Sequence, residues 1–226
     1  PDVIKLVTMA NSPSDCIRLL KLVSEAEVPT VGFCMGEFGT ASRVLCGKYG
    51  SPFTYASFSS EREVAPGILT FQDMKDLYRF DSINRDTQVF GVLGDPIGHS
   101  LSPLLHNTVM KQIGFNGVYM PLRVTRDQLP QMLKDFQWLN VRGYSVTIPH
   151  KEAALAAANK CEEIVRQIGA ANTLSCDDKG NWEADNTDYQ AALDSLQLAM
   201  GEGNSLEGKR VLMLGAGGAA RAIGLG

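Results

Sequence analysis

The sequence predicts an α/β protein, and three observations lead to that fold class. Short apolar runs alternate with segments of helical spacing, a pattern typical of parallel strands covered by helices. Polar residues follow several of these runs directly, where open α/β sheets bind ligands. A glycine pattern of the dinucleotide-binding type follows an apolar run near the end of the sequence.

Residues 1–80 are expected to hold three strand–helix pairs. The predicted strands are 3–8, 31–35 and 53–57, with the first two buried, and the predicted helices are 13–26, 40–46 and 71–78. Three strands are too few to close a barrel, so we interpret this region as the C-terminal part of a (β/α)8 barrel.

A second α/β region follows the polar segment 81–88, which is the predicted linker. Its predicted strands are 89–93, 118–123, 144–147, 173–176, 181–184 and 210–214, and its predicted helices are 101–113, 126–136, 150–168 and 189–200. We divide it into a domain over 89–188 and the start of a Rossmann domain over 189–226.

The composition excludes several classes of function. The net charge is −4, without the clustered Lys and Arg that a nucleic-acid or anionic-membrane surface needs. No apolar run approaches the roughly 18 residues that span a bilayer. The five cysteines are widely spaced and form no CxxC pair, so we expect a reducing compartment and no metal site.

The glycine pattern predicts a cofactor loop. Glycines let the backbone approach a pyrophosphate, whose charge meets the free amides of a helix N-terminus. A tight turn without a ligand is the alternative, but the expected strand before it and helix after it favour a nucleotide. The loop residues are Gly215, Ala216, Gly217, Gly218, Ala219 and Ala220. The ribose-reading residue stands about 20 residues further on in such units, so we expect the chain to stop inside this domain.

Two further motifs place polar residues after strands. In GDPIGHSLSP, residues 94–103, two hydroxyls beside free helix amides suit a carboxylate; plain N-capping by one serine is the alternative. In GYSVTIPHK, residues 143–151, Thr147 ends a strand and Lys151 enters a helix. A desolvated or paired lysine there carries a proton, whereas a solvated helix-start lysine is the alternative.

The runs GAANT and NTD complete the set. Asn172 and Asp188 stand beside strand ends, and an N-cap role is the alternative for Asp188. Since all these residues follow strands, we expect their side chains to converge on one cleft that suits a small polyhydroxylated carboxylic acid. A Lys–Asp pair would then move a proton while a cofactor moves a hydride.

From Gln88 to Gly226 the sequence resembles shikimate dehydrogenases, through GDPIGHSLSP, SVTIPHK, GAANT, NTD and GAGGAAR in family order. The resemblance implies that 3-dehydroshikimate is reduced reversibly to shikimate with NADP. It implies a catalytic pair, Lys151 and Asp188, and a substrate carboxylate held by Ser100 and Ser102. Thr147, Asn172 and Asp188 would contact the ring hydroxyls, and the glycine loop would bind NADP.

Residues 1–80 resemble type I 3-dehydroquinate dehydratases, which are (β/α)8 barrels. Lys5, in VIKLVTMA, stands at the place of that family's Schiff-base lysine, where desolvation in an apolar strand favours the free amine. Arg43 matches the arginine that binds the substrate carboxylate, and residues 65–67 match the substrate loop. Val64 and Ile68 depart from the family pattern of Ser and Gln.

A dehydratase before a dehydrogenase resembles the bifunctional plant enzymes of the shikimate pathway. That resemblance implies a plastid protein and a monomer acting on small molecules, although the chain carries no targeting segment. We expect this piece alone to be inactive. A quinate dehydrogenase with a decayed dehydratase half, suggested by Val64 and Ile68, and a non-catalytic ligand-binding relative remain as alternatives.

Overall fold

The computed structural model describes residues 2–59, 67–201 and 207–225. It divides into two compact units, Pro1–Tyr144 and Ser145–Gly226. Both units combine helices with strands, as the alternating pattern predicted, and each is described by itself.

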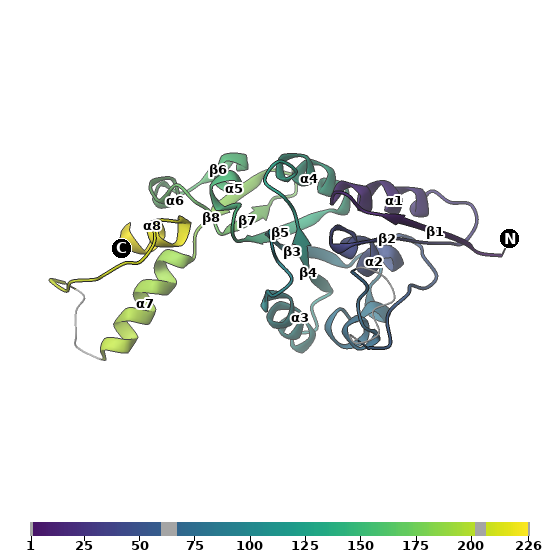
Figure 1. Ribbon diagram of the computed structural model, residues 1–226, viewed down its shortest axis with the longest axis horizontal. Coiled ribbons are helices and arrows are strands. Elements are labelled where there is room, and N and C mark those ends of the chain that lie inside the picture. The colour runs from purple at the N-terminus through teal and green to yellow at the C-terminus, as the bar shows by residue number, and fades with distance from the viewer. Residues whose placement is uncertain (1, 60–66, 202–206, 226) are drawn as a thin grey trace. The chain divides into compact units, whose positions relative to one another are not determined.

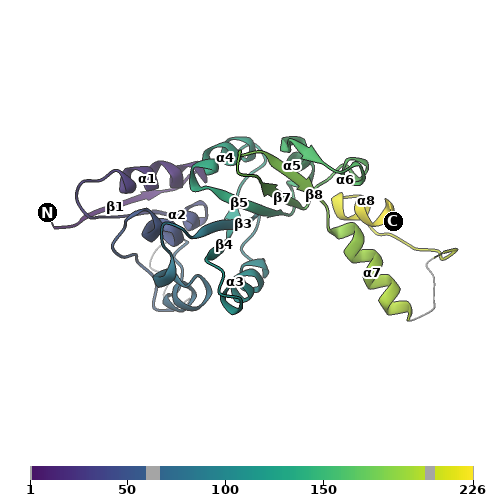
Figure 2. The ribbon, with the colours of Figure 1, turned by 180° about the vertical axis from the view of Figure 1, so that it is seen from behind.

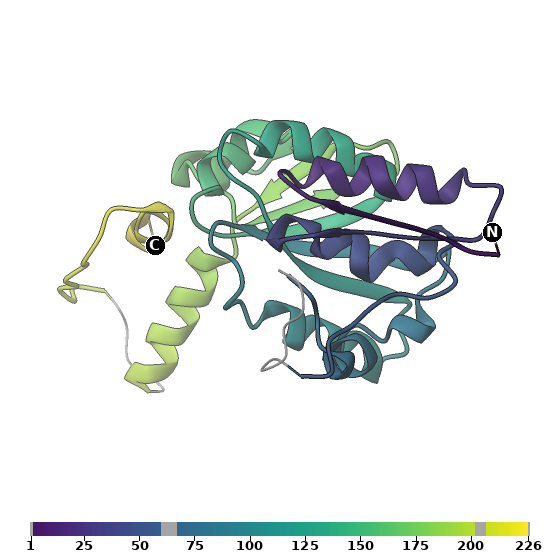
Figure 3. The same ribbon diagram turned by 45° about the vertical axis from the view of Figure 1, so that its right-hand side comes forward.

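The first unit begins with a strand–helix–strand element (Figure 1). Strands β1 (Ile4–Met9) and β2 (Thr30–Met35) pair in parallel, with Lys5 opposite Val31. Helix α1 (Ser14–Ser24) joins them and packs on β2, because its apolar side chains recur every three or four residues and are buried. Figure 3 shows α1 lying along this strand pair. The expected elements at 3–8, 13–26 and 31–35 are therefore confirmed.

The burial expected for β1 is wrong, since all six of its side chains are exposed. In the described part of the chain β1 pairs with β2 alone, and α1 contacts β2. An apolar strand is buried only where other elements cover it, and those elements cannot be predicted from the residues of the strand itself.

The strand expected at 53–57 is also wrong. Only Ser57 forms a bridge there, to Thr70. A strand needs a continuous ladder of backbone hydrogen bonds, and no such ladder forms at 53–57 among the described residues. The helix expected at 71–78 forms as a π-helical turn, η4 (Asp73–Leu77).

Helix α2 (Thr40–Leu45) follows β2 as expected. The 3-10 turns η1 (Glu37–Gly39) and η2 (Cys46–Tyr49) flank it. Residues 41–45 are all buried, and Arg43 is among them.

The later part of the first unit is a parallel sheet. Strands β3 (Gln88–Gly94) and β4 (Gly117–Arg123) pair in parallel with β3 also beside β5 (Val141–Val146). Helix α3 (Ser102–Gln112) connects β3 to β4, and α4 (Leu129–Asp135) with η6 (Phe136–Leu139) connects β4 to β5. Buried Asn107 of α3 donates to the Tyr119 carbonyl and accepts from the Tyr119 amide, at 2.8 and 2.9 Å. That reciprocal bond attaches α3 to β4.

The second unit holds the predicted hairpin. Strands β7 (Thr173–Cys176) and β8 (Trp182–Asp185) are antiparallel, and the short β6 (Lys160–Cys161) pairs with β8 in parallel. Helix α7 (Asp188–Met200) confirms the helix expected at 189–200. Figure 2 shows α7 beside α8 (Gly218–Leu225).

The single helix expected over 150–168 is wrong. The structure has two helices, α5 (Lys151–Ala157) and α6 (Glu163–Ile168), with β6 between them. Ala158 is extended, and Asn159 exchanges 2.8 Å hydrogen bonds with the Trp182 backbone. Pairing with β8 therefore interrupts a stretch whose Ala and Glu content favours a helix.

The strand expected at 210–214 is absent. These residues have no regular secondary structure, and Leu212 and Leu214 are exposed. No described strand pairs with them, so their apolar pattern alone does not produce a ladder. The helix expected after the glycine motif is confirmed as α8.

Candidate active sites

Lys151 and Asp188 form an ion pair in the second unit. Lys151 begins α5 and Asp188 begins α7, and Lys151 Nζ lies 2.5 Å from Asp188 Oδ2. The two side chains are 19% and 29% exposed, so the pair is partly shielded from water but open to a ligand. The carboxylate partner of the ammonium favours the paired lysine over the solvated helix-start lysine.

Asn172 completes this cluster from the residue before β7. Its Nδ2 donates to Asp188 Oδ1 and to Thr187 Oγ1, both at 2.8 Å. Its Oδ1 accepts from the Thr187 amide at 3.0 Å and from Thr173 Oγ1 at 2.9 Å. Asn172 therefore fixes the carboxylate that Lys151 contacts.

Asn186 also contributes to this cluster, although it was not predicted as a site residue from the NTD motif. It is buried, its Nδ2 donates to the Ala170 carbonyl at 2.8 Å, and its Oδ1 accepts from the Asp188 amide at 3.0 Å. The Asn-x-Asp spacing is typical of such an Asx turn and was the available signal. Asn186 sets the backbone from which Asp188 projects.

Ser100 and Ser102 lie in the first unit, in the loop between β3 and α3. Ser102 is the first residue of α3, and its amide donates to Ser100 Oγ at 3.3 Å. Plain N-capping by one serine was the alternative, but the N-cap residue of α3 is Leu101. Both serines are half-buried at the carboxyl end of a parallel strand.

Thr147 directly follows β5 and begins the turn that leads to α5. Its carbonyl accepts from the His150 amide at 2.9 Å, and the residue is half-buried. This turn places Thr147 four positions before Lys151.

The glycine loop also lies in the second unit. A methyl group at Gly218 would lie 3.3 Å from Lys151 Cδ and from Ala170 Cβ, whereas one at Gly217 would meet nothing within 4 Å. The start of α8 is thus close to the Lys151 side chain, and the loop before it leaves room for a ligand. These residues fit a pyrophosphate at a helix N-terminus.

The two dehydratase residues occupy one aromatic cluster in the first unit. Lys5 Nζ lies 3.9 Å above the ring of Tyr55, and the Arg43 guanidinium lies 4.4 Å from the ring of Phe33. The Phe33 and Tyr55 rings are 5.6 Å apart. The desolvation expected for Lys5 is not found, because its strand is exposed. Phe33 and Tyr55 were missed, since isolated aromatics in apolar runs carry no specific signal.

Arg43 is an unusual cation. It is 1% exposed, and none of its guanidinium nitrogens has a hydrogen-bond partner among the described residues. Burial lowers the pKa of Arg43. A buried guanidinium without an anion is an arrangement that a ligand carboxylate would complete. Ala65 and Pro66 of the expected substrate loop, and Val64 before it, lie outside the described residues.

The described residues hold neither a cluster of metal ligands nor a helix that could cross a membrane. No group of three or more His, Cys, Asp or Glu residues there is arranged to hold a metal ion. None of the helices in the same ranges has both the length and the apolarity to cross a membrane. All five cysteines are free, and three of them are buried.

Comparison with known families identifies both halves. Residues 1–85 match the type I 3-dehydroquinase family, and residues 92–174 match the shikimate dehydrogenase substrate binding domain. The chain is 38% identical over its full length to the chloroplastic bifunctional 3-dehydroquinate dehydratase/shikimate dehydrogenase of Arabidopsis thaliana, of which it covers 39%.

Solved structures agree with the second half. Shikimate dehydrogenase from Aquifex aeolicus is 36% identical with a TM-score of 0.58, over 62% of this chain and 52% of that one. The Thermus thermophilus enzyme, in complex with NADP(H) and shikimate, is 38% identical with a TM-score of 0.53, over 60% of this chain and 50% of that one. The chain thus spans about half or less of the length of these relatives. The resemblance to both families is confirmed: a type I 3-dehydroquinase segment precedes a shikimate dehydrogenase segment.

Proposed function

We propose that this chain belongs to a bifunctional shikimate-pathway enzyme. One activity dehydrates 3-dehydroquinate to 3-dehydroshikimate, and the other reduces 3-dehydroshikimate to shikimate with NADPH. The observation that carries the second activity is the Lys151–Asp188 ion pair, held by Asn172 beside the start of α8. The named relatives and the order of the two segments support the combination.

In the dehydrogenase reaction, Lys151 and Asp188 handle the proton. NADPH held by residues 215–220 would supply hydride chemistry at this site. The Lys151 ammonium donates a proton to the carbonyl oxygen, and Asp188 stabilises the ammonium beforehand at 2.5 Å. In the reverse direction, the neutral amine of Lys151 accepts the proton of the hydroxyl group.

The remaining side chains bind and orient the substrate. Ser100 and Ser102 would hold the carboxylate with their hydroxyls and nearby helix amides. Thr147 and Asn172 would contact the ring hydroxyls. Residues 215–220 would hold the pyrophosphate of NADP, since the loop is open and precedes a helix N-terminus.

Arg43 and Lys5 carry the dehydratase proposal. The guanidinium of Arg43, which has no hydrogen-bond partner in the part of the chain that the structure describes, would bind the carboxylate of 3-dehydroquinate. Lys5 would form a Schiff base with the ketone, and its ammonium is already oriented by the ring of Tyr55. Loss of water from the imine intermediate and its hydrolysis would release 3-dehydroshikimate and regenerate Lys5.

The domain boundaries and cellular setting belong to the same proposal. We place the dehydratase segment at 1–80, the linker at 81–88, the substrate-binding domain at 89–188 and the start of the cofactor domain at 189–226. A plastid location follows the chloroplastic relative, and we propose a monomer that binds small molecules and no nucleic acid.

The test is substrate selectivity in the full-length protein. We expect NADP-dependent oxidation of shikimate with a kcat/KM at least tenfold above that for quinate, and dehydration of 3-dehydroquinate in a separate assay. A preference for quinate without dehydratase activity would support the quinate dehydrogenase instead. Binding of shikimate without any turnover would support the non-catalytic relative.

A further inference from the structure

Two paired strands of the first unit and the turn that follows a third strand come into contact. Strand β3 ends at Gly94 and β4 at Arg123, and these two residues are opposite each other in the ladder. The turn η1, which follows the end of β2, packs against β4. The turn after β2, in one family segment, therefore contacts β4 in the other, whose carboxyl end lies opposite that of β3.

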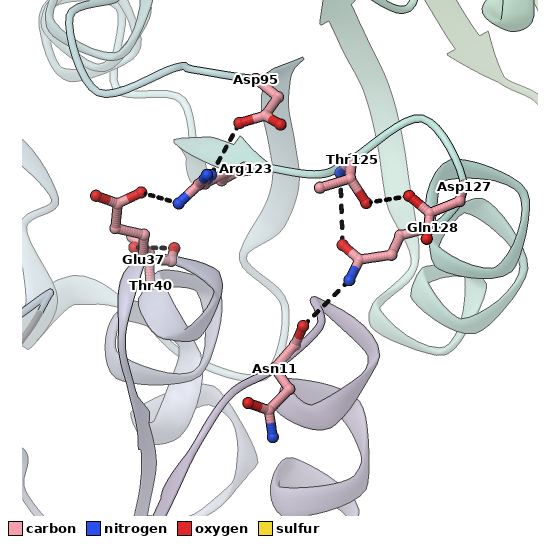
Figure 4. Close-up of polar contacts among 8 residues, drawn as sticks. All are labelled: Asn11, Glu37, Thr40, Asp95, Arg123, Thr125, Asp127 and Gln128. Carbon is pink, nitrogen blue, oxygen red and sulfur yellow. Dashed lines mark hydrogen bonds and ion pairs between the residues drawn. The ribbon is translucent and has the colours of Figure 1, made fainter.

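Arg123 joins the two segments at this edge. Its Nε donates to Asp95 Oδ1 at 2.9 Å, and its Nη1 donates to Glu37 Oε2 at 2.5 Å (Figure 4). The guanidinium also lies 5.1 Å from the ring of Phe38. Glu37 belongs to the dehydroquinase segment, whereas Asp95 belongs to the dehydrogenase segment. The planar fork of arginine can hold two carboxylates at once in this way.

Further contacts keep the segments from moving apart. Gln128 Nε2 donates to the Asn11 carbonyl at 3.1 Å, and α1 packs on α4 (Figure 4). Arg79 donates to the Gly117 carbonyl at 3.0 Å, and the rings of Tyr49 and Trp138 stack at 4.5 Å. The two family segments therefore share a packed interface around Arg123.

Asp95 is connected to the serines of the candidate carboxylate site. It opens the loop that runs from β3 to α3, and Ile97 in that loop is buried against Val92 and Tyr119. The Ser100 amide donates to the Ile97 carbonyl at 3.1 Å, and the Ser102 amide donates to Ser100 Oγ at 3.3 Å. The loop is thus fixed at its start by Arg123, in its middle by Ile97 and at its end by Ser100.

We propose that Arg123 is a positioning residue through which Glu37 of the dehydratase segment sets the geometry of the shikimate-carboxylate loop. This inference rests on the proposed function, because it assigns the loop to shikimate. The charge of Glu37 orients the Arg123 fork, and the fork holds Asp95 at the start of the loop. Loss of Glu37 releases one arm of the fork and loosens the loop that carries Ser100 and Ser102.

The ion pair of Glu37 and Arg123 is suited to positioning the loop more than to stabilising the fold. Glu37 is 68% exposed and Arg123 is 35% exposed. Exposed ion pairs contribute little to the free energy of unfolding. An effect on substrate affinity can therefore be separated from an effect on folding.

The experiment measures shikimate kinetics and amide hydrogen exchange in the full-length protein. For Glu37→Gln we expect a two- to fivefold rise in KM for shikimate, an unchanged kcat and faster exchange of the amides at 97–102. For Arg123→Met we expect a rise of about tenfold in KM, and adding Glu37→Gln should have no further effect, as for residues acting in one chain of contacts. Glu27→Gln, an exposed acid of the same segment, is the matched control and should behave as wild type.

Wild-type KM in Glu37→Gln, or fully additive effects of the two substitutions, would overturn the inference. A fall in kcat with KM unchanged would also overturn it, because positioning of the carboxylate loop acts on binding. Should the wild-type protein not turn over shikimate, the proposed function fails, and the exchange rates at 97–102 alone decide whether Glu37 and Arg123 act together on the loop.

Discussion

At the scale of single residues, Arg43 shows how an incomplete site differs from a structural one. A structural buried cation has an anionic or hydrogen-bonding partner, because an isolated one is costly. Arg43 has only the face of Phe33 among the described residues. This arrangement supports the proposal that the surroundings of Arg43 serve a ligand at the expense of stability.

Replacing Arg43 should separate stability from binding. We expect Arg43→Met to raise the free energy of unfolding by about 1–3 kcal/mol, since the variant removes three buried nitrogens that have no hydrogen-bond partner among the described residues. Stabilisation by added 3-dehydroquinate should disappear in the same variant. Urea unfolding with and without that ligand measures both effects.

Arg18→Met is the matched control, because the Arg18 side chain is exposed on α1. It should change the free energy of unfolding by less than about 0.5 kcal/mol and should leave ligand stabilisation intact. An Arg43→Met protein that unfolds more easily than wild type in the absence of ligand would contradict the account of an unsatisfied site.

Site residues could be predicted from the sequence only where they stand in a motif. The pairing of Lys151 with Asp188 followed from two motifs that each place a polar residue after a strand. Arg123 carried no such signal, because its partner Asp95 is 28 positions away and its partner Glu37 is 86 positions away. Long side chains that connect separate elements are visible only once the elements are placed.

At the scale of elements, β2 and the start of α2 come into close contact at Gly39. A methyl group there would lie 2.5 Å from the carbonyl oxygen of Cys34 and 2.8 Å from its carbon. Both atoms are backbone of β2, so they cannot rotate away. The close approach lets α2 turn directly back onto β2 and brings Arg43 towards Phe33.

Gly39→Ala should therefore destabilise the protein by about 1–3 kcal/mol, as other overpacked sites do. Gly98→Ala is the control, since a methyl group at Gly98 meets nothing within 4 Å. Thermal unfolding of the two variants gives the comparison. Equal melting temperatures would show that α2 can move away from β2 without cost.

An apolar run predicted a strand correctly only where neighbouring elements pair with it or cover it. The apolar run at 31–35 became β2 because β1 and α1 cover it. The equally apolar run at 210–214 formed no strand, because no described strand pairs with it. The break between α5 and α6 likewise depends on Trp182, which is 23 residues beyond Asn159.

At the scale of the whole molecule, the family boundary and the compact units do not coincide. The two family segments meet between residues 85 and 92, but the first compact unit continues through Tyr144. The predicted linker at 81–88 is held inside that unit: Lys48 Nζ donates to the carbonyls of Arg85 and Thr87, at 2.6 and 2.8 Å. The polar composition predicted a linker between two domains, and hydrogen bonds from distant Lys48 attach this segment to the first unit.

Removing the Lys48 contact should expose this segment to protease. We expect trypsin to cleave after Arg85 roughly tenfold faster in Lys48→Met, because two hydrogen bonds no longer oppose local opening. Lys111→Met, on the surface of α3, also removes a tryptic site, and in this variant trypsin should cleave after Arg85 at the wild-type rate. Identical cleavage after Arg85 in both variants would show that Lys48 does not hold the segment.

The measurement that tests the central claim most directly is NADP-dependent oxidation of shikimate by full-length wild-type and Lys151→Met proteins. The pair of Lys151 and Asp188 is proposed to move the proton, so we predict a fall in kcat of roughly 10²- to 10⁴-fold, with KM for shikimate changed only a few fold. Lys179→Met, in the exposed turn of the β7–β8 hairpin, should keep wild-type kinetics. Unchanged turnover in Lys151→Met would contradict the account.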